Sequence, residues 1–256
     1  WTVQWAAARG HSAAHIPLTT PTPCPAGPSG PDWGDTRHRT GPGDGQAPAS
    51  EHPPTSVEHW DERYSGEPTW SGNPNGALVA EVAGLTPGRA LDIGCGEGAD
   101  AVWLAQQGWQ VTGLDISGVA LEHARAAAEA AGVQAEWIHS GLDDVELPED
   151  GFDLVSVFYP ALPSQPEGVN LIALLGAVAP GGTLLFVGHA DIDPEEARAR
   201  GFDPEDYLSI DDLEAALQRS SRWEIAVRER RPRHVEGGAG GGHTHDEILK
   251  AVRSAD

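Results

Sequence analysis

Short apolar runs alternate with longer helix-like stretches along the chain from residue 57 onward. Runs rich in Val, Ile, Leu and Phe predict strands, and the Ala-, Leu- and Glu-rich stretches between them predict helices. This alternation is typical of β-α-β units, so the pattern predicts a doubly wound α/β domain with a parallel sheet. The predicted strands are residues 90–93, 110–115, 135–139, 152–158, 183–187, 223–228 and 247–252. The predicted helices are residues 74–83, 98–107, 117–131, 171–178 and 210–219, with another after residue 194.

Several of these elements carry signals at their ends. Asn73 is expected to cap the first helix, with Pro74 at its first helical position. Ser117 is expected to cap a later helix, which Gly132 ends. The Gly-rich loop 237–242 separates the last two strands, so these strands are expected to form a hairpin at one edge of the sheet.

The first 56 residues have a different composition. They are rich in Pro, Gly, Ser and Thr and show neither the helical nor the strand period. Such a segment buries too little apolar area to offset the entropy that it loses on ordering. We therefore expect residues 1–56 to form a disordered tail and residues 57–256 to form the folded domain.

The charge of the chain excludes several partners. Its 256 residues include 39 Asp and Glu against 16 Lys and Arg, which gives a net charge of −23. This acidity repels nucleic-acid phosphates and anionic membranes, and the apolar runs are too short for a membrane-spanning helix. The two cysteines indicate neither a disulfide framework nor a zinc site, and His243–Asp246 lacks a third ligand spaced to complete a metal site. We therefore expect a cytoplasmic protein without a metal site.

A glycine-rich segment, Leu91–Gly98, follows a predicted strand and opens a predicted helix. Glycines at such a turn let a nucleotide-like ligand lie against bare backbone at the start of the helix. Gly94, Gly96 and Ala99 also match the G-x-G-x-x-A pattern of dinucleotide-binding domains, with Asp115 about twenty residues further on. The spacing alone therefore leaves two classes of ligand open.

The residue that favours one class is Asp92, two residues before the first glycine of the turn. A carboxylate at this strand end suits a ligand that carries an ammonium and a sulfonium group, and it repels a pyrophosphate. Asp92 therefore favours a cationic nucleoside cofactor. A nicotinamide-dependent oxidoreductase, using NAD or NADP, remains the alternative.

Three segments together resemble a known family. Leu91–Gly98, Asp115–Ser117 and Phe152–Val155 are similar to successive motifs of class I S-adenosylmethionine-dependent methyltransferases. The resemblance covers residues 57–256 and implies a Rossmann-like methyltransferase fold with a mostly parallel, seven-stranded sheet. It also implies S-adenosylmethionine as the cofactor and methyl transfer as the reaction. A catalytically silent cofactor-binding module is a third hypothesis.

The resemblance implies a role for individual residues at the turn. Gly94 and Gly96 are expected to approach the cofactor, Asp115 to bind the ribose hydroxyls, and Asp92 to orient the turn or the amino group. The complete set of expected cofactor-binding residues is Asp92, Gly94, Cys95, Gly96, Asp115, Ile116, Leu142, Asp143 and Phe158.

The segment after the third strand departs from the family pattern. Gly141 stands where the family often has an acidic residue. Leu142 is therefore expected to cover the adenine, and Asp143 to supply the acidic group from a neighbouring position.

A weaker resemblance covers residues 60–75. This segment is similar to the N-terminal lid of tellurite-resistance-type and thiopurine-type methyltransferases, which act on small molecules. Trp60, Tyr64 and Trp70 are expected either to close over the cofactor or to pack an N-terminal helix onto the sheet.

The expected methyl acceptor is a small molecule. The residues after the fourth strand lack the Asn/Asp-Pro-Pro-aromatic signature of many methyltransferases that act on nucleic acids and on protein amines. Tyr159 and His189 follow two of the strands at the edge where α/β sheets bind ligands, and His189 with Asp191 is suited to supply a base or to bind the acceptor. We therefore expect Tyr159 and His189 to be catalytic. A thiol, a chalcogen anion or a natural-product hydroxyl is the expected acceptor.

Overall fold

The computed structural model of the protein describes residues 55–165, 167–190, 192–199, 201–233 and 244–255. The predicted tail lies almost wholly outside these ranges, so a domain boundary near residue 56 stays a prediction. Within the same ranges, no helix is long and apolar enough to cross a membrane.

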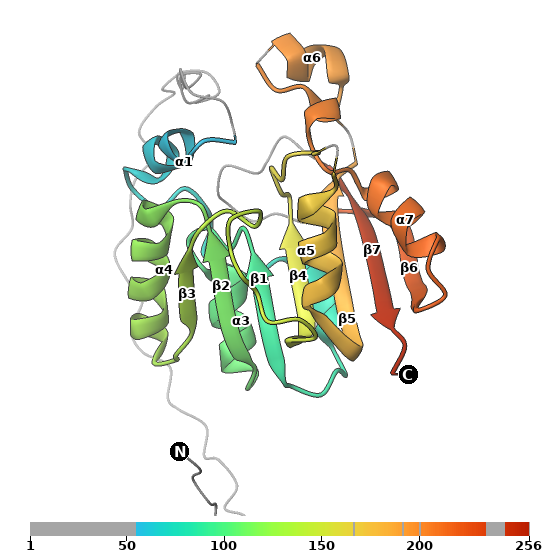
Figure 1. Cartoon of the computed structure of the whole chain (residues 1–256). Coiled ribbons are helices and arrows are strands. Elements are labelled where there is room, and N and C mark those ends of the chain that lie inside the picture. The colour runs from blue at the N-terminus through green and yellow to red at the C-terminus, as the bar shows by residue number, and fades with distance from the viewer. Residues whose placement is uncertain (1–54, 166, 191, 200, 234–243, 256) are drawn as a thin grey trace, which may run out of the picture. The chain divides into compact units, whose positions relative to one another are not determined.

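In the described part of the chain, seven strands form one mixed sheet in the order β3-β2-β1-β4-β5-β7-β6 (Figure 1). The first five strands in this order pair in parallel, whereas β7 is antiparallel to both β5 and β6. The predicted fold class is therefore confirmed, with two antiparallel pairings at one edge. The strands are β1 (Arg89–Ile93), β2 (Gln110–Asp115), β3 (Glu136–His139), β4 (Phe152–Phe158), β5 (Val178–His189), β6 (Trp223–Pro232) and β7 (His245–Arg253).

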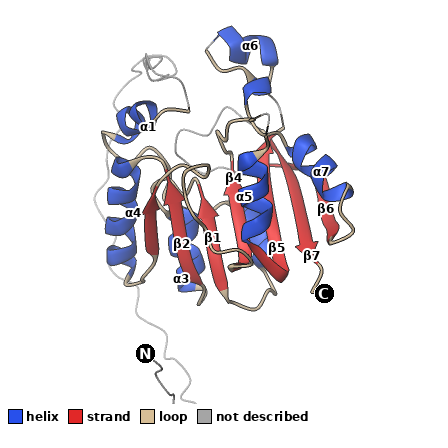
Figure 2. Cartoon of the chain, in the orientation of Figure 1, coloured by secondary structure: helices blue, strands red, loops and turns tan. Residues whose placement is uncertain are grey.

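Helices cover both faces of the sheet (Figure 2). On one face, Leu78 and Leu104 pack with Leu154 of β4 in one apolar core. On the other face, Leu174 and Leu213 pack in a second core. The sheet is thus buried between two helical layers. The helices are α1 (Val57–Tyr64), α2 (Gly76–Val82), α3 (Ala99–Gln106), α4 (Gly118–Ala131), α5 (Val169–Ala177), α6 (Pro194–Ala199), the 3-10 turn η1 (Pro204–Asp206) and α7 (Ile210–Gln218).

The ends of α4 follow the signals in the sequence. The Ser117 hydroxyl accepts a hydrogen bond from the Ala120 amide at 3.1 Å, which satisfies a backbone donor of the first turn. Gly132 ends the helix with a φ of 67°, a conformation that glycine adopts without strain. Both predicted caps of this helix are confirmed.

The predicted start of α2 is wrong. The helix begins at Gly76 rather than Pro74, and Asn75 rather than Asn73 takes the N-cap position. The Asn75 side chain does not cap the helix but donates a hydrogen bond to Asp100 of α3. A tertiary contact has therefore replaced the local capping interaction on which the prediction rested.

The predicted boundary between α5 and the following strand is also wrong. Val178, expected to end the helix, is the first residue of β5 and pairs with Phe152 of β4. The strand thus begins five residues before the predicted position. Pairing with β4 overrides the helical period of the apolar residues here.

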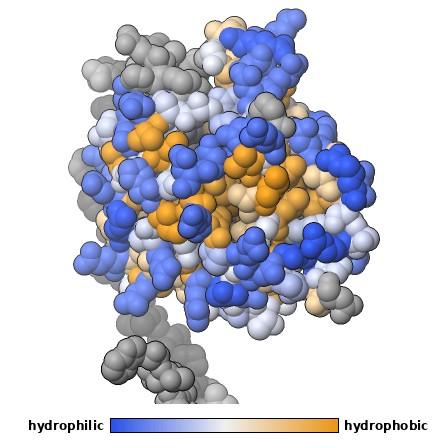
Figure 3. Space-filling model, viewed as in Figure 1, coloured by the Kyte–Doolittle hydropathy of each residue, from blue (hydrophilic) through white to orange (hydrophobic). Residues whose placement is uncertain are grey.

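Segments from several parts of the chain meet at one edge of the sheet. The parallel strands β1, β2 and β4 end at the same edge, and α1 lies beyond it (Figure 1). In the space-filling view, hydrophilic residues cover much of the visible face, and apolar residues gather over its middle (Figure 3). Ligands of α/β sheets bind at the carboxyl ends of the strands, so this edge is where the candidate site is expected.

Candidate functional site

The glycine turn connects β1 to α3 in a backbone conformation that few residues other than glycine adopt. Gly94, Gly96 and Gly98 have φ values of 68°, 52° and 82°. The amides of Gly94 and Cys95 donate hydrogen bonds to the Leu114 carbonyl of β2 at 2.8 and 3.1 Å, which fixes the turn against the sheet. A side chain added at Gly94 would meet no atom of the described residues within 4 Å, so a ligand is able to approach the backbone there.

Cys95, in the middle of this turn, faces the interior. Its thiol is buried, and its sulfur lies 2.9 Å from where a side-chain carbon at Gly113 would stand. Burial raises the pKa of the thiol, which keeps it neutral. The predicted contact of Cys95 with a cofactor would therefore be made by backbone atoms and not by the thiol.

Asp115 at the end of β2 holds the turn together. Its carboxylate accepts hydrogen bonds from the Gly96 amide and the Ser117 amide, each at 2.8 Å. The side chain is buried, and burial raises its pKa while the two amides oppose that shift. Next to it, the Ile116 carbonyl lies 2.9 Å from Nε2 of His139. The carboxylate therefore stands beside the glycine turn, where the sequence predicts a ribose.

Asp92 has one unsatisfied oxygen. The Ser156 hydroxyl donates a hydrogen bond to Asp92 Oδ1 at 2.9 Å, but Asp92 Oδ2 is buried with no hydrogen-bond partner among the described residues. The side chain is only 3% exposed. Burial raises its pKa well above the ordinary value, and the charge of Asp100 adds to this effect. A ligand with a hydrogen-bond donor or a positive charge would satisfy this oxygen.

Asp92→Asn is expected to raise the melting temperature by about 2–4 °C at neutral pH. The folded-state pKa of Asp92 lies above its unfolded value, so stability is lost as the pH rises from the unfolded pKa through the folded pKa. Neutral pH lies above the unfolded pKa, so this loss applies there, and the amide cannot ionise while it keeps an acceptor for Ser156. Thermal denaturation at neutral pH measures the change, with the exposed Asp153→Asn as the control variant. A lower melting temperature for Asp92→Asn would show that its charge stabilises the fold.

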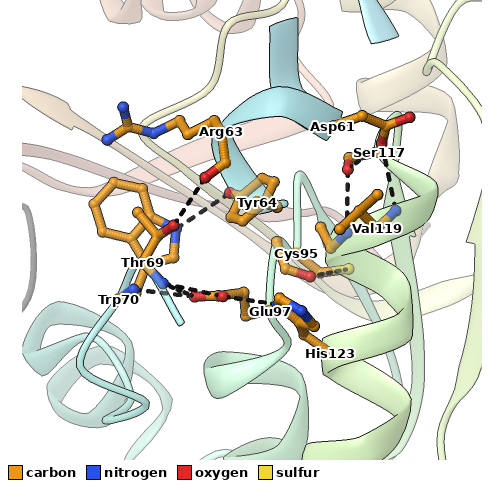
Figure 4. Close-up of polar contacts among 12 residues, drawn as sticks. Asp61, Arg63, Tyr64, Thr69, Trp70, Cys95, Glu97, Ser117, Val119 and His123 are labelled. Carbon is orange, nitrogen blue, oxygen red and sulfur yellow. Dashed lines mark hydrogen bonds and ion pairs between the residues drawn. The ribbon is translucent and has the colours of Figure 1, made fainter. Parts of the chain in front are cut away.

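The segment from α1 to Trp70 is fastened to the glycine turn by side chains of the α/β core (Figure 4). Ser117 donates to Asp61 at 2.6 Å, which joins α1 to the start of α4. The Glu97 carboxylate accepts from the amides of Thr69 and Trp70 at 3.1 and 3.0 Å. His123 of α4 lies 3.0 Å from the same carboxylate. These contacts hold the segment over the turn.

Aromatic side chains of this segment lie at the turn itself. Tyr64 is buried, and its hydroxyl would be 3.0 Å from a side-chain carbon placed at Gly96. The Trp70 indole donates to the Tyr64 hydroxyl at 3.1 Å, and Trp60 stacks on the Tyr64 ring with centroids 6.1 Å apart. The expected lid segment therefore covers the turn. Its aromatic residues were predicted, whereas its polar fastening by Asp61 and Glu97 was not.

The loop after β3 brings Asp143 close to Gly141. A side-chain carbon at Gly141 would lie 2.7 Å from Asp143 Oδ1, at the movable end of that side chain. Asp143 is exposed and accepts a hydrogen bond from Gln165 at 2.9 Å. Leu142 is buried in the core on the α5 and α7 side of the sheet. Their contacts with an adenine stay predictions.

Five side chains meet where β4 and β5 end. The Tyr159 hydroxyl donates to Asp246 at 3.0 Å, and the Tyr159 ring stacks on His189 with centroids 4.3 Å apart. The Arg233 guanidinium lies 4.5 Å from the centre of the Tyr159 ring, and Phe158 makes an edge contact with it at 6.1 Å. The structure thus brings the predicted residues Tyr159 and His189 together.

Tyr159 has an unusual backbone and a shifted acidity. Its φ of 49° is rare for a residue other than glycine and is a form of local strain found at functional sites. Burial raises its pKa, and the charge of Asp246 adds to this effect, so the phenol keeps its proton at neutral pH. Tyr159 is therefore a hydrogen-bonding group, and His189 is the neighbour with the chemistry of a base.

Arg233 and Asp246 were not among the predicted site residues, although Asp246 lies in the run His243–Asp246. Asp191, predicted beside His189, lies outside the described residues, as does His243. Within the described ranges, no group of three or more His, Cys, Asp or Glu side chains is arranged to hold a metal ion.

Comparison with known proteins identifies the domain. Residues 90–182, which include the glycine turn and β4, match a family model described as a methyltransferase domain. An uncharacterised methyltransferase of Mycobacterium bovis is 34% identical over 119 residues, which are 46% of this chain and 59% of the relative. The chain contains a class I S-adenosylmethionine-dependent methyltransferase domain. The predicted family is confirmed.

Solved structures support the methyltransferase fold over a larger part of the chain. A structure from work on the conversion of a disulfide bond into a thioacetal group during echinomycin biosynthesis has a TM-score of 0.62 and 28% identity, and the match covers 78% of this chain and 92% of that one. A Burkholderia thailandensis 1,6-didemethyltoxoflavin-N1-methyltransferase with bound S-adenosylhomocysteine has a TM-score of 0.52 and 17% identity, covering 70% and 76% of the two chains. The match to the mycobacterial relative, in contrast, spans less than two thirds of the relative's length.

Proposed function

We propose that the protein transfers a methyl group from S-adenosylmethionine to a small-molecule acceptor. The observation that carries this proposal is the buried, unsatisfied Asp92 Oδ2 beside the glycine turn. A positively charged nucleoside matches this carboxylate and the open backbone at Gly94, whereas a pyrophosphate would place negative charge against a carboxylate. The residues present therefore fit S-adenosylmethionine.

In the proposed reaction, the chain acts mainly by binding and orienting. S-adenosylmethionine, when bound, supplies a methyl group on a positively charged sulfur. Asp115 binds the ribose, Gly94 accepts the ligand against bare backbone, and the lid segment, whose Tyr64 lies against Gly96, excludes water. Holding the donor and the acceptor in line provides most of the catalysis, so no nucleophile of the enzyme is required.

The acceptor is proposed to lie beside Tyr159 and His189. A sulfur acceptor is favoured among the expected classes, because the structure from echinomycin biosynthesis concerns a disulfide and has 28% identity to this chain. A thiol or chalcogen anion needs no base, whereas a hydroxyl acceptor would need His189 to take its proton.

The experiment is to incubate the protein with S-adenosylmethionine and a panel of thiols, selenite-derived anions and phenols, and to measure the S-adenosylhomocysteine released. Release above background with a sulfur or chalcogen acceptor is expected. Release with nucleic acid or protein alone would contradict a small acceptor.

With an acceptor from this panel, Tyr159→Phe is expected to lower turnover about tenfold, and His189→Ala to lower it about 100-fold for a hydroxyl acceptor. The first variant removes the hydrogen bond to Asp246, and the second removes the base. Neither change touches the glycine turn, so the affinity for S-adenosylhomocysteine should stay the same. Tyr207→Phe is a matched control, because Tyr207 is also buried but stacks on Phe202 in the segment before α7. Unchanged turnover in both test variants would remove these residues from the acceptor site.

A further inference from the structure

A cavity lies between α5 and α7, two helices on the same face of the sheet (Figure 2). Its volume is about 190 Å³, and its walls are residues 163–165 after β4, the start of α5, Leu208 and one face of α7. None of the described residues that line this α5–α7 cavity belongs to the proposed cofactor or acceptor site. An engineered cavity of about 150 Å³ holds a benzene molecule, so the α5–α7 cavity has room for one small organic molecule.

The α7 wall of the cavity has a charged residue at each end. Asp212, Ala215 and Arg219 line the cavity at spacings of three and four residues, which places them on one face of the helix. Arg219 continues this face because its backbone at the end of α7 is still helical. The small side chain of Ala215 leaves room between the carboxylate and the guanidinium. The cavity therefore has a negative and a positive end.

Two side-chain amides in the opposite wall each have an unsatisfied oxygen. Asn170 is only 2% exposed, and its Nδ2 donates to the Pro163 carbonyl at 3.0 Å. Gln165 Nε2 donates to the Asp143 carboxylate at 2.9 Å. Since the NH₂ group of each amide already faces an oxygen, the other atom of each is a carbonyl oxygen. Asn170 Oδ1 and Gln165 Oε1 are both buried and accept no hydrogen bond from the described residues. A ligand with N–H donors would satisfy them.

The two charged residues of α7 also have capacity for a ligand. Asp212 Oδ2 accepts a hydrogen bond from the Ser209 hydroxyl at 2.6 Å and completes the cap of α7. Asp212 Oδ1 accepts none from the described residues. Arg219 is exposed and forms no ion pair within the described ranges. The α5–α7 cavity thus combines three acceptor oxygens with one guanidinium.

We propose that the α5–α7 cavity binds a free α-amino acid. The ammonium group supplies one N–H donor for each of the oxygens on Gln165, Asn170 and Asp212, and the carboxylate pairs with Arg219. A simple anion would meet the acceptor oxygens of the cavity, and a simple amine would leave Arg219 unpaired. The proposal concerns a site apart from the glycine turn and does not rest on the proposed methyl transfer.

The test is calorimetric titration of the protein with glycine, L-alanine, L-serine and L-threonine, and in parallel with propionate and ethanolamine. At least one amino acid is expected to bind with a dissociation constant of about 1 mM or lower. Propionate lacks the ammonium group and ethanolamine lacks the carboxylate, so each should bind about tenfold more weakly or worse. If no amino acid binds, or if either single-charge compound binds as tightly, the proposal is overturned.

A titration in the presence of saturating S-adenosylhomocysteine separates the two sites. This compound carries an amino-acid group of its own, so a free amino acid could enter the cofactor site instead. We expect the affinity for the amino acid to stay the same. Loss of binding would place the amino acid in the cofactor site and overturn the proposal. A protein that binds the amino acid but not S-adenosylhomocysteine contradicts the proposed function alone.

Two substitutions locate the binding site. Ala215→Leu fills the cavity and should weaken amino-acid binding about tenfold or more, whereas Ala216→Leu makes the same change at a half-buried position outside the cavity and should not. Arg219→Gln should weaken binding about tenfold, with the exposed Arg222→Gln as its control. If Ala215→Leu does not fold, as judged by circular dichroism, Arg219→Gln decides, because its side chain is exposed. Wild-type affinity in a folded Ala215→Leu or Arg219→Gln variant overturns the proposal.

Discussion

Asp115→Ala is expected to lower the affinity for S-adenosylhomocysteine by about 100-fold or more, because a carboxylate that binds two hydroxyls contributes a few kcal/mol through charged hydrogen bonds. The same substitution removes the acceptor for the amides of Gly96 and Ser117. The loss of the ribose contacts and the loss of the two backbone hydrogen bonds both occur at the proposed ribose site. Isothermal titration calorimetry measures the loss, and circular dichroism establishes that the variant remains folded.

Two controls isolate the role of Asp115. Asp153→Ala removes an exposed carboxylate that accepts from the Arg89 amide at the other end of the sheet, and it should bind S-adenosylhomocysteine as the wild type does. Asp115→Asn keeps one oxygen for a backbone amide and should fall between wild type and Asp115→Ala. If Asp115→Ala folds and binds with wild-type affinity, the ribose assignment is wrong.

Gly98→Ala is expected to destabilise the protein by about 2–5 kcal/mol, the sum of a left-handed backbone penalty and steric overlap. Gly98 has a φ of 82°, and an added side-chain carbon would lie 2.8 Å from the side-chain carbon of Ala124 and 3.0 Å from the Trp137 ring. It would also lie 3.1 Å from the Ala124 backbone, which cannot move without shifting α4. Urea denaturation measures the free energy of unfolding.

Gly132→Ala is the matched control for this prediction. Gly132 has a similar φ of 67°, but no atom of the described residues lies within 4 Å of an added side-chain carbon. Only the backbone penalty of about 1–2 kcal/mol therefore applies. Equal losses in the two variants would show that close packing of α3 against α4 does not require glycine at position 98.

The features that the sequence predicted correctly are those encoded by neighbouring residues. Ser117 and Gly132 act on the backbone within one turn of α4, so their positions alone define the ends of the helix. The glycine turn is local in the same way. Its positive φ values at Gly94, Gly96 and Gly98 favour glycine, and the glycines are visible in the sequence. Apolar runs similarly identified the strands, whose burial depends on their own composition.

The features that the sequence did not predict depend on contacts between distant residues. Asn75 was not recognised because its partner, Asp100, is 25 positions away and replaces the cap that local rules would assign. Asp246 lies 87 positions from Tyr159, and only the pairing of β7 with β5 brings the two together. Contacts between such distant residues leave no periodic pattern or short motif in the sequence. They become visible only in the folded structure.

The departure at Gly141 is a third case. The expectation that Asp143 stands in for the missing acid follows from the sequence, and in the structure its carboxylate approaches Gly141. Whether that carboxylate contacts the adenine stays a prediction, because its known partner is Gln165.

The most direct test of the proposed cofactor is calorimetric titration of the purified protein with S-adenosylhomocysteine and, in parallel, with NADH. Micromolar binding of S-adenosylhomocysteine without binding of NADH is the predicted result, because the glycine turn is flanked by the unsatisfied carboxylate of Asp92. Binding of NADH alone, or of neither compound, would contradict the proposal that this site holds a methyl donor.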